Sequence, residues 1–361
     1  MTWYLAMLAA TAAQTAQPTI EDLRQRIWTA CVDLPASRQG PDSRASSEQA
    51  CDARRAPVLR QLRELGQTAD QSTRLAALGL IFAWAPPAQA RRALADMVRI
   101  GRDDRYLPPA LEAGYGESRA PDKRQALEQL RQTTKSRAVA GSATYLLASQ
   151  TLADKSATGS ARMLAISRLR SIVRRYADVP TTVLGAGDPP HLGQAAAAVL
   201  FRIERLTPGK TLPPMHAMDL QGRAVDDRAF AGTITLIDFW ATWCPPCVAA
   251  MPTLRQVHAR YAGRNFQIVS ISGDVTAQQP ASFVMRNGID WPQWRIGPSG
   301  RVSAQWSNSS FPNYILVDAQ HRIVATDDKL DTVLKQLDAA LADPAIRGRR
   351  HAGTPRSGRT F

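Results

Sequence analysis

The stretch Phe239-Trp-Ala-Thr-Trp-Cys-Pro-Pro-Cys247 (FWATWCPPC) decides the fold of the carboxy-terminal part of this chain of 361 residues. It overlaps the end of an apolar run, Thr233–Trp240 (TITLIDFW), which predicts a buried strand. From Pro245 to about Tyr261 the sequence predicts a helix. The two cysteines of the Cys-x-x-Cys motif therefore lie where a strand ends and a helix begins.

This position suits a reactive thiol pair. Cys244 at a helix start lies near unpaired backbone N–H groups and the positive end of the helix dipole, and both stabilise a thiolate. Pro245 and Pro246 already have the φ of a first helical turn, where their missing N–H groups cost little. One turn of helix brings Cys247 close enough to form a disulfide with Cys244. We expect Cys244 to be the exposed nucleophile and Cys247 the buried resolving thiol.

Zinc binding is the alternative use of this spacing. A structural zinc site needs four ligands. Outside the motif the chain offers Cys31, Cys51 and five scattered histidines, with no second ligand pair. The sequence therefore favours redox chemistry over a metal site, and we expect neither a metal nor an organic cofactor.

Elements downstream of the motif predict an α/β domain over residues 207–346, with a central mixed sheet. Short apolar runs with strand character alternate there with helical stretches and turn residues. The expected strands are Phe266–Ser272 and the hairpin-like pair Tyr314–Asp318 and Arg322–Ala325, and the expected helices are Gln278–Arg286 and Leu330–Leu341.

These residues resemble the TlpA/ResA-like periplasmic thioredoxin family, within the thioredoxin superfamily, over about residues 207–343. Three elements in the right order carry the resemblance. They are the motif followed by Met251-Pro252, the upstream segment Pro208–Arg223, which is similar to the family's amino-terminal hairpin, and Phe311–Asp318, which is similar to its cis-proline loop. The resemblance does not extend to residues 20–206.

The resemblance implies a thiol–disulfide oxidoreductase, and more specifically a protein disulfide reductase. Its substrates would be disulfide-containing proteins, and a membrane-embedded thiol electron donor would regenerate the dithiol. Pro312 would be the cis-proline beside the dithiol, and the backbone of Phe311 would pair with an extended substrate segment. Trp243 would shield the dithiol and border bound substrate, and Pro252 would kink the active-site helix.

Asp238 is the third candidate catalytic residue. It lies six residues before Cys244 and matches the buried acid of thioredoxins, which takes the proton from the resolving cysteine. Its strand is apolar, so we expect the carboxyl to be buried and its pKa to be raised. The chain departs from the family at Ala250, where a glutamate usually precedes the Met-Pro step. This departure puts in doubt any cytochrome-maturation role that depends on that glutamate.

Residues 20–206 predict an α-helical domain, either a bundle or a short solenoid. Apolar residues recur at helical spacing, as in Leu169, Ile172, Val173 and Tyr176. Proline breakers recur at short intervals, which suggests antiparallel helices joined by short loops. No fixed internal period identifies a repeat family.

The amino terminus predicts export to the periplasm or another exported location. Residues 1–16 have an apolar stretch and an Ala-x-Ala arrangement, typical of a signal peptide, although no basic residue precedes the stretch. In an exported protein Cys31 and Cys51 are expected to form a structural disulfide across a polar loop. Two free thiols in a reduced compartment are the alternative.

The net charge of +14 is unevenly distributed. Residues 1–206 carry 28 Lys and Arg against 19 Asp and Glu, residues 207–346 carry 12 of each, and residues 347–361 carry five Arg and no acid. The last segment predicts a disordered basic tail. The other basic residues are scattered along helix faces and are not interleaved with stacking aromatics, so we expect no nucleic-acid partner.

Two other functions are alternatives to a disulfide reductase. A thiol peroxidase would need Pro-x-x-x-Thr-x-x-Cys, but the corresponding positions before Cys244 are Ile237 and Ala241. Before Cys247 they are Trp240 and Cys244, so neither cysteine fits. A helical scaffold or partner-binding module with a secondary redox domain remains open, because the helical region is long and has no assigned role.

Overall fold

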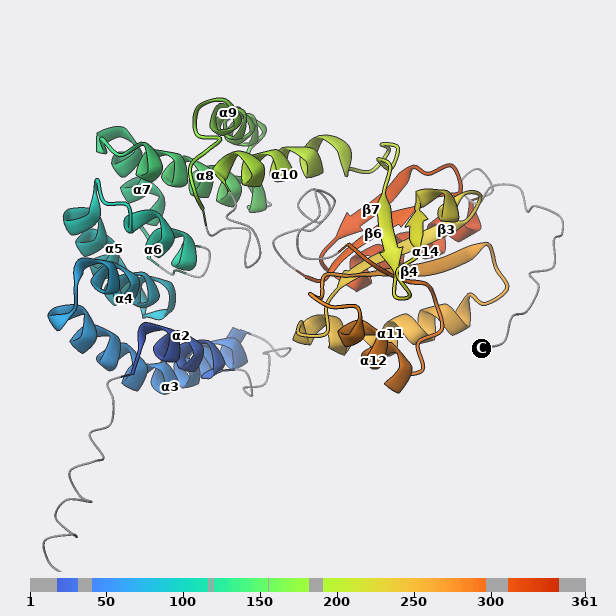
Figure 1. The fold of residues 1–361 in the computed structure, drawn as a ribbon, viewed down its shortest axis with the longest axis horizontal. Helices are drawn as coiled ribbons and strands as arrows, with labels where there is room; N and C mark the ends of the chain where they lie inside the picture. The colour runs from blue at the N-terminus through green and yellow to red at the C-terminus, as the bar shows by residue number, and fades with distance from the viewer. Residues whose placement is uncertain are drawn as a thin grey trace, which may run out of the picture. The chain divides into compact units, whose positions relative to one another are not determined.

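A computed structural model describes residues 18–31, 41–115, 118, 120–154, 156–181, 191–296 and 311–343. The predicted signal peptide (1–16) and basic tail (347–361) lie outside these residues. The chain divides into two compact units, residues 1–158 and 159–361 (Figure 1).

Helices make up the described part of the first unit. Each packs against the next helix in the chain, the next but one, or both, and Figure 1 shows them stacked in chain order. This pattern is that of a short solenoid rather than a closed bundle. The helices are α2 (Ile20–Thr29), α3 (Pro41–Thr68), α4 (Gln71–Trp84), α5 (Pro87–Gly101), α6 (Leu107–Gly114), α7 (Lys123–Thr133) and α8 (Arg137–Ala153).

Helix α4 illustrates how the sequence sets these helices. Asp70 caps its start, since the carboxylate accepts hydrogen bonds from the backbone N–H groups of Ser72 and Thr73 at 2.9 and 3.2 Å. Further along, a Cβ at Gly79 would lie 2.7 Å from the carbonyl oxygen of Ala110 in α6. Only glycine therefore allows α4 and α6 to cross so closely.

A disulfide joins Cys31, just after α2, to Cys51 in α3, with their Cα atoms 5.5 Å apart. The bond closes a loop with a sequence separation of 20 residues. In the chain-entropy account, a loop of this length stabilises the fold by about 3 kcal/mol.

We expect non-reducing peptide mapping of native protein to recover Cys31 linked to Cys51. The double variant Cys31→Ser/Cys51→Ser should lose about 3 kcal/mol of unfolding free energy, because its unfolded chain is no longer cross-linked. Denaturant unfolding followed by circular dichroism measures this loss. Two free thiols in freshly isolated protein would contradict the structural role.

The second unit begins with two helices, α9 (Gly159–Arg175) and α10 (Leu192–Arg205), which pack against each other. The predicted helical region, residues 20–206, therefore does not coincide with the first unit. Packing accounts for the difference, because Phe201 of α10 and the following Leu206 join a hydrophobic core on one face of the sheet.

A seven-stranded mixed sheet with the order β2-β1-β5-β4-β3-β6-β7 forms the centre of the second unit. The strands β3, β4 and β5 are parallel, and the other pairs are antiparallel. The strands are β1 (His216–Asp219), β2 (Ala224–Asp226), β3 (Ile234–Trp240), β4 (Phe266–Ser272), β5 (Gln293–Arg295), β6 (Asn313–Val317) and β7 (Ile323–Asp327).

The helices of this domain are α11 (Pro245–Arg260), α12 (Gln278–Arg286) and α14 (Leu330–Ala342), with a 3-10 turn, η1, at Asp227–Phe230. In Figure 1, α11 and α12 lie below the sheet. The predicted α/β domain with a mixed sheet is confirmed.

The side chains of β3 alternate between two hydrophobic cores. Ile234, Leu236 and Trp240 belong to the core that also contains both cysteines of the motif and residues of α11 and α14. Ile237 and Phe239 belong to the opposite core. Because alternate residues of a strand share a face, Asp238 lies on the same face as the cysteines.

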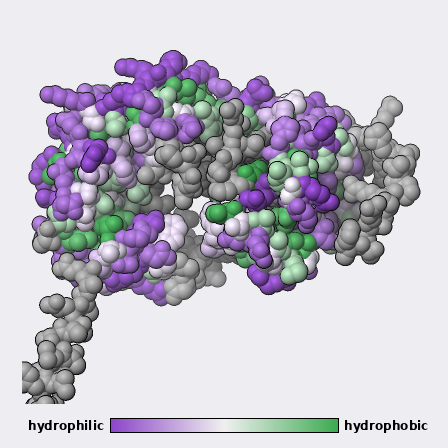
Figure 2. Space-filling view, viewed as in Figure 1, coloured by the Kyte–Doolittle hydropathy of each residue, from purple (hydrophilic) through white to green (hydrophobic). Residues whose placement is uncertain are grey.

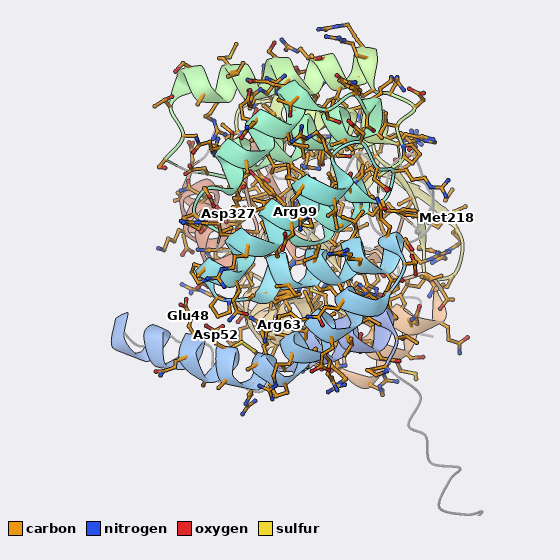
Figure 3. All side chains as sticks on the ribbon, turned by 90° about the vertical axis from the view of Figure 1, so that its left-hand side faces the viewer. Glu48, Asp52, Arg63, Arg99, Met218 and Asp327 are labelled. Atoms are coloured by element: carbon orange, nitrogen blue, oxygen red, sulfur yellow. A yellow bond between two sulfur atoms is a disulfide. The ribbon has the colours of Figure 1, made fainter. Side chains whose placement is uncertain are left out.

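Polar and charged side chains cover most of the visible surface, and apolar side chains form small separate patches (Figure 2). Arg63 of α3 and Arg99 of α5 lie on different helices of the first unit (Figure 3). Among the described residues, no helix combines the length and apolarity needed to cross a membrane.

Candidate active site

The two cysteines of the motif lie at the start of α11 and are joined by a disulfide, with Cα atoms 5.3 Å apart. Cys244 is the N-cap residue, and Pro245 and Pro246 occupy the first helical positions. The backbone N–H of Cys247 donates a hydrogen bond to Cys244 Sγ over 3.2 Å. The helix start thus directs a donor at this sulfur, where it can stabilise negative charge.

The exposure expected for Cys244 is wrong for this disulfide-bonded state. Cys244 is only 4% exposed and Cys247 1%. The reason is packing, because both cysteines belong to the core cluster that contains Trp240 and Met251. Trp243, the residue just before Cys244, is instead 60% exposed.

The loop before β6 lies beside the motif. Asn313, the first residue of β6, pairs with Phe239 near the end of β3. The Phe311–Pro312 peptide bond is cis. The ring of Phe311 meets that of Trp243 edge to face, with centroids 5.6 Å apart. The structure therefore brings two of the predicted substrate-binding residues, Trp243 and Phe311, into contact.

Gly273 allows this arrangement. A Cβ added at this glycine would lie 2.5 Å from Phe311 Cζ, so a larger residue would displace the ring. The backbone N–H of Gly273 also donates to the carbonyl of Trp240 over 2.9 Å. The segment after β4 thus contacts both the end of β3, just before the motif, and the loop before β6.

Asp274 fixes the turn before the cysteines and was not predicted from the sequence. Its carboxylate accepts hydrogen bonds from the backbone N–H of Thr242, at 3.1 and 3.2 Å to its two oxygens, and from Thr242 Oγ1 at 2.6 Å. The Ser272 hydroxyl donates to the same carboxylate over 2.7 Å. Three donor groups, one of them shared between both oxygens, therefore reach this fully buried acid and compensate for its burial.

The buried position predicted for Asp238 is confirmed, since the residue is only 1% exposed. Burial raises its pKa to about 7, and a hydrogen bond from the Ser270 hydroxyl, 2.8 Å from Oδ2, acts in the opposite direction. Tyr314 lies directly opposite Asp238 on β6. Burial, and then the charge of Asp238, raises the pKa of this tyrosine.

The roles of Ser270 and Trp291, like that of Asp274, do not follow from the sequence pattern. Ser270 lies opposite Asp238 on β4, and the Trp291 indole N–H donates to its hydroxyl over 2.9 Å. A weak signal was present, because Ser270 and Ser272 alternate with apolar residues in an otherwise apolar strand. Within the described ranges, no group of three or more His, Cys, Asp or Glu side chains could hold a metal ion.

Comparisons with known proteins also concern this domain. The Redoxin family model matches residues 207–341. The thiol-disulfide oxidoreductase ResA of Bacillus thuringiensis subsp. konkukian is 24% identical over 140 residues, which cover 37% of this chain and 80% of that protein. A thiol:disulfide interchange protein DsbE homolog of Paracoccus denitrificans is 27% identical over 143 residues, or 37% of this chain and 77% of that protein.

A solved structure, the thioredoxin domain of a thiol-disulfide oxidoreductase from Bacteroides vulgatus, is 24% identical to this chain. It covers 37% of this chain and 98% of its own length, with a TM-score of 0.34. The family match and the two relatives cover little more than a third of the chain.

Proposed function

We propose that Cys244 and Cys247 reduce disulfides in protein substrates. The premise is that the carboxy-terminal part of the chain is a redoxin domain, similar to the TlpA/ResA-like thiol–disulfide oxidoreductases of the thioredoxin superfamily. The observation that carries the proposal is the Cys244–Cys247 pair at the start of α11, with a backbone N–H directed at Cys244 Sγ.

The proposed reaction begins with the reduced pair. The Cys244 thiolate attacks one sulfur of a substrate disulfide, and the other substrate sulfur leaves as a thiolate that takes a proton from solvent. This step forms a mixed disulfide between Cys244 and the substrate. The backbone N–H of Cys247 stabilises the Cys244 thiolate before the attack. As the new S–S bond forms, the negative charge passes from Cys244 Sγ to the leaving substrate sulfur.

Resolution of the mixed disulfide needs a second thiolate. Asp238 accepts the proton of the Cys247 thiol, and the Cys247 thiolate then attacks Cys244 Sγ. The substrate sulfur leaves as a thiolate and is protonated. The substrate has then gained two electrons and two protons, and the pair has become the Cys244–Cys247 disulfide. A thiol donor must reduce this disulfide before the next cycle.

The substrate would bind over the exposed end of the domain. Trp243 and Phe311 present aromatic surface there. The backbone around Phe311 and Pro312 precedes β6, and in this proposal it pairs with an extended peptide, in the manner of an added strand. The proposed substrates are therefore disulfides in extended or unfolded segments.

We also propose that the protein is exported, and that its donor is a thiol carrier embedded in the membrane. Two observations support export. The Cys31–Cys51 disulfide is typical of an oxidising compartment, and the amino-terminal residues have the pattern of a signal peptide. In such a compartment the dithiol needs a continuous supply of electrons.

Reduction of insulin by the full chain tests the proposed function. With dithiothreitol as donor, the chain should accelerate precipitation of the insulin B chain well above the rate with donor alone. The matched control is Cys244→Ser/Cys247→Ser, which should give only the donor's rate. If the native chain also gave only that rate, the redox assignment would be wrong, and a partner-binding scaffold would become the better explanation.

A further inference from the structure

A buried hydrogen-bond chain runs toward Asp238 from the loop before β5. The Trp291 indole N–H donates to Ser270 Oγ over 2.9 Å, and Ser270 Oγ lies 2.8 Å from Asp238 Oδ2. All three residues are buried: Trp291 is 4% exposed, Asp238 1% and Ser270 not at all. Strand register fixes the second link, because Ser270 pairs directly with Asp238 across β3 and β4.

The chemistry of the three groups gives this chain a direction. An indole N–H can only donate a hydrogen bond, so the Ser270 oxygen acts as its acceptor. The hydroxyl has one proton, and Asp238 is the acceptor within reach of it. An ionised carboxylate accepts a hydrogen bond from this hydroxyl more strongly than a neutral carboxyl does. The chain therefore favours the charged form of Asp238, whereas burial favours the neutral form.

Among the described residues, only the hydrogen bond from Ser270 stabilises the charged form of Asp238. On β6, Tyr314 faces it, and on α14 the Asp331 carboxylate acts on that tyrosine. On α11 the two cysteines share its core. At the Trp291 end of the hydrogen-bond chain, the centroid of the His258 ring of α11 lies 5.3 Å from that of the Trp291 ring. His258 Nε2 lies 3.3 Å from Asp290 Oδ1.

We propose that Trp291 and Ser270 form a relay, in which the indole N–H orients the Ser270 hydroxyl so that it donates a hydrogen bond to Asp238, and that this relay sets the pH at which the mixed disulfide is resolved. This inference rests on the proposed role of Asp238 as the proton acceptor. Ser270 and Trp291 are positioning residues, since they act through Asp238 and, within the described part of the chain, donate no hydrogen bond to either cysteine sulfur.

Titration of the Asp238 carboxyl by isotope-edited infrared spectroscopy tests the relay directly. The full chain is used in its oxidised form, so that no thiol titrates, and Asp238→Asn identifies the band. Ser270→Ala removes the donated proton and should raise the pKa of Asp238 by about one pH unit, the effect expected for losing a hydrogen bond to a charged group. Ser270→Thr keeps a hydroxyl and should restore the native titration.

Trp291→Phe is the second test, and it remains available if Ser270→Ala does not fold. Without the indole donor, the Ser270 hydroxyl can turn and accept a hydrogen bond from the O–H of neutral Asp238. The pKa of Asp238 should therefore rise, but by less than in Ser270→Ala. Native titration in both Trp291→Phe and Ser270→Ala, or in Trp291→Phe alone where the other variant is unfolded, would overturn the relay.

Kinetics separate the relay from the role of Asp238 itself. The pH midpoint of mixed-disulfide resolution should move upward in Ser270→Ala together with the infrared midpoint. If the infrared titration moves and the resolution rate does not follow, Asp238 is not the proton acceptor in catalysis, although the hydrogen-bond chain still controls its ionisation. If the infrared titration does not move, the relay is wrong whatever the rates are.

Discussion

Replacing Cys247 with serine should convert the protein into a trap for its substrates. Cys244 can still attack a substrate disulfide, but no second thiol remains to release the mixed disulfide. Cys247→Ser protein should therefore accumulate adducts through Cys244. Cys244→Ser protein should accumulate few or none, because Cys247 lacks the N-cap position and the N–H directed at its sulfur.

Acid quenching, alkylation and mass spectrometry of the two variants measure this difference. Insulin turnover should fall in both, on the order of 10³-fold or more, as expected when an enzyme loses a group that its covalent chemistry requires. The matched control is Cys31→Ser/Cys51→Ser, which leaves the reactive pair intact and should trap nothing. Equal trapping by Cys244→Ser and Cys247→Ser would show that the assignment of nucleophile is wrong.

The substitution Asp238→Asn should slow resolution while sparing the first attack. Asparagine cannot accept the proton of Cys247, so the second step should slow on the order of 10²-fold, as is typical for the loss of a general base. Formation of the mixed disulfide should hardly change, since it depends on Cys244. Stopped-flow fluorescence of Trp240 and Trp243 separates the two steps. A resolution rate that does not vary between pH 6 and pH 8 in the native protein would contradict the role of Asp238.

The same substitution should stabilise the oxidised protein at neutral and higher pH. Burial raises the pKa of Asp238 to about 7, so between about pH 4 and pH 7 the folded state keeps a proton that the unfolded state has lost. Unfolding free energy therefore falls as pH rises through this interval, by a few kcal/mol in total. Asp238→Asn removes this dependence and keeps the shape of the side chain.

Denaturant unfolding of oxidised native and Asp238→Asn proteins at pH 5 and pH 8 measures the effect. The unfolding free energy of the variant should exceed that of the native protein by about 2–4 kcal/mol at pH 8, and by much less at pH 5. Ser270→Ala is an informative companion because it removes the hydrogen bond but keeps the buried acid. The same stability difference at both pH values would mean that Asp238 does not titrate in the folded state.

Much of the redox domain could be predicted because its decisive features are local. Thr233–Trp240 and Phe266–Ser272 are continuous apolar runs, and β3 and β4 match them to within one residue. The burial of Asp238 follows from its place in one of these runs. By contrast, β5 has only three residues, Gln293–Arg295, and owes its place in the sheet to pairing with β4 and β1.

The parts of the site that could not be predicted depend on residues far apart in the sequence. Asp274 reaches Thr242 across 32 positions, and Ser270 reaches Asp238 across the same separation. No local pattern specifies such partners, because the strand register that brings them together is set by the whole sheet. The exposure expected for Cys244 is wrong for a similar reason. Its position at a helix start does not specify the core that packs around it.

Two apolar residues, one in α10 and one just after it, pack on the sheet and determine where this chain can be divided. Leu206 belongs to the core on one face of the sheet and Phe201 packs against it, yet both precede residue 207, where the match to the Redoxin family starts. A gene fragment cut at residue 207 would leave that face partly uncovered, and the product would lose apolar burial. A cut between residues 158 and 159 follows the division between the compact units. For recombinant expression or domain exchange, the transferable module is therefore the redox fold together with the two helices before it.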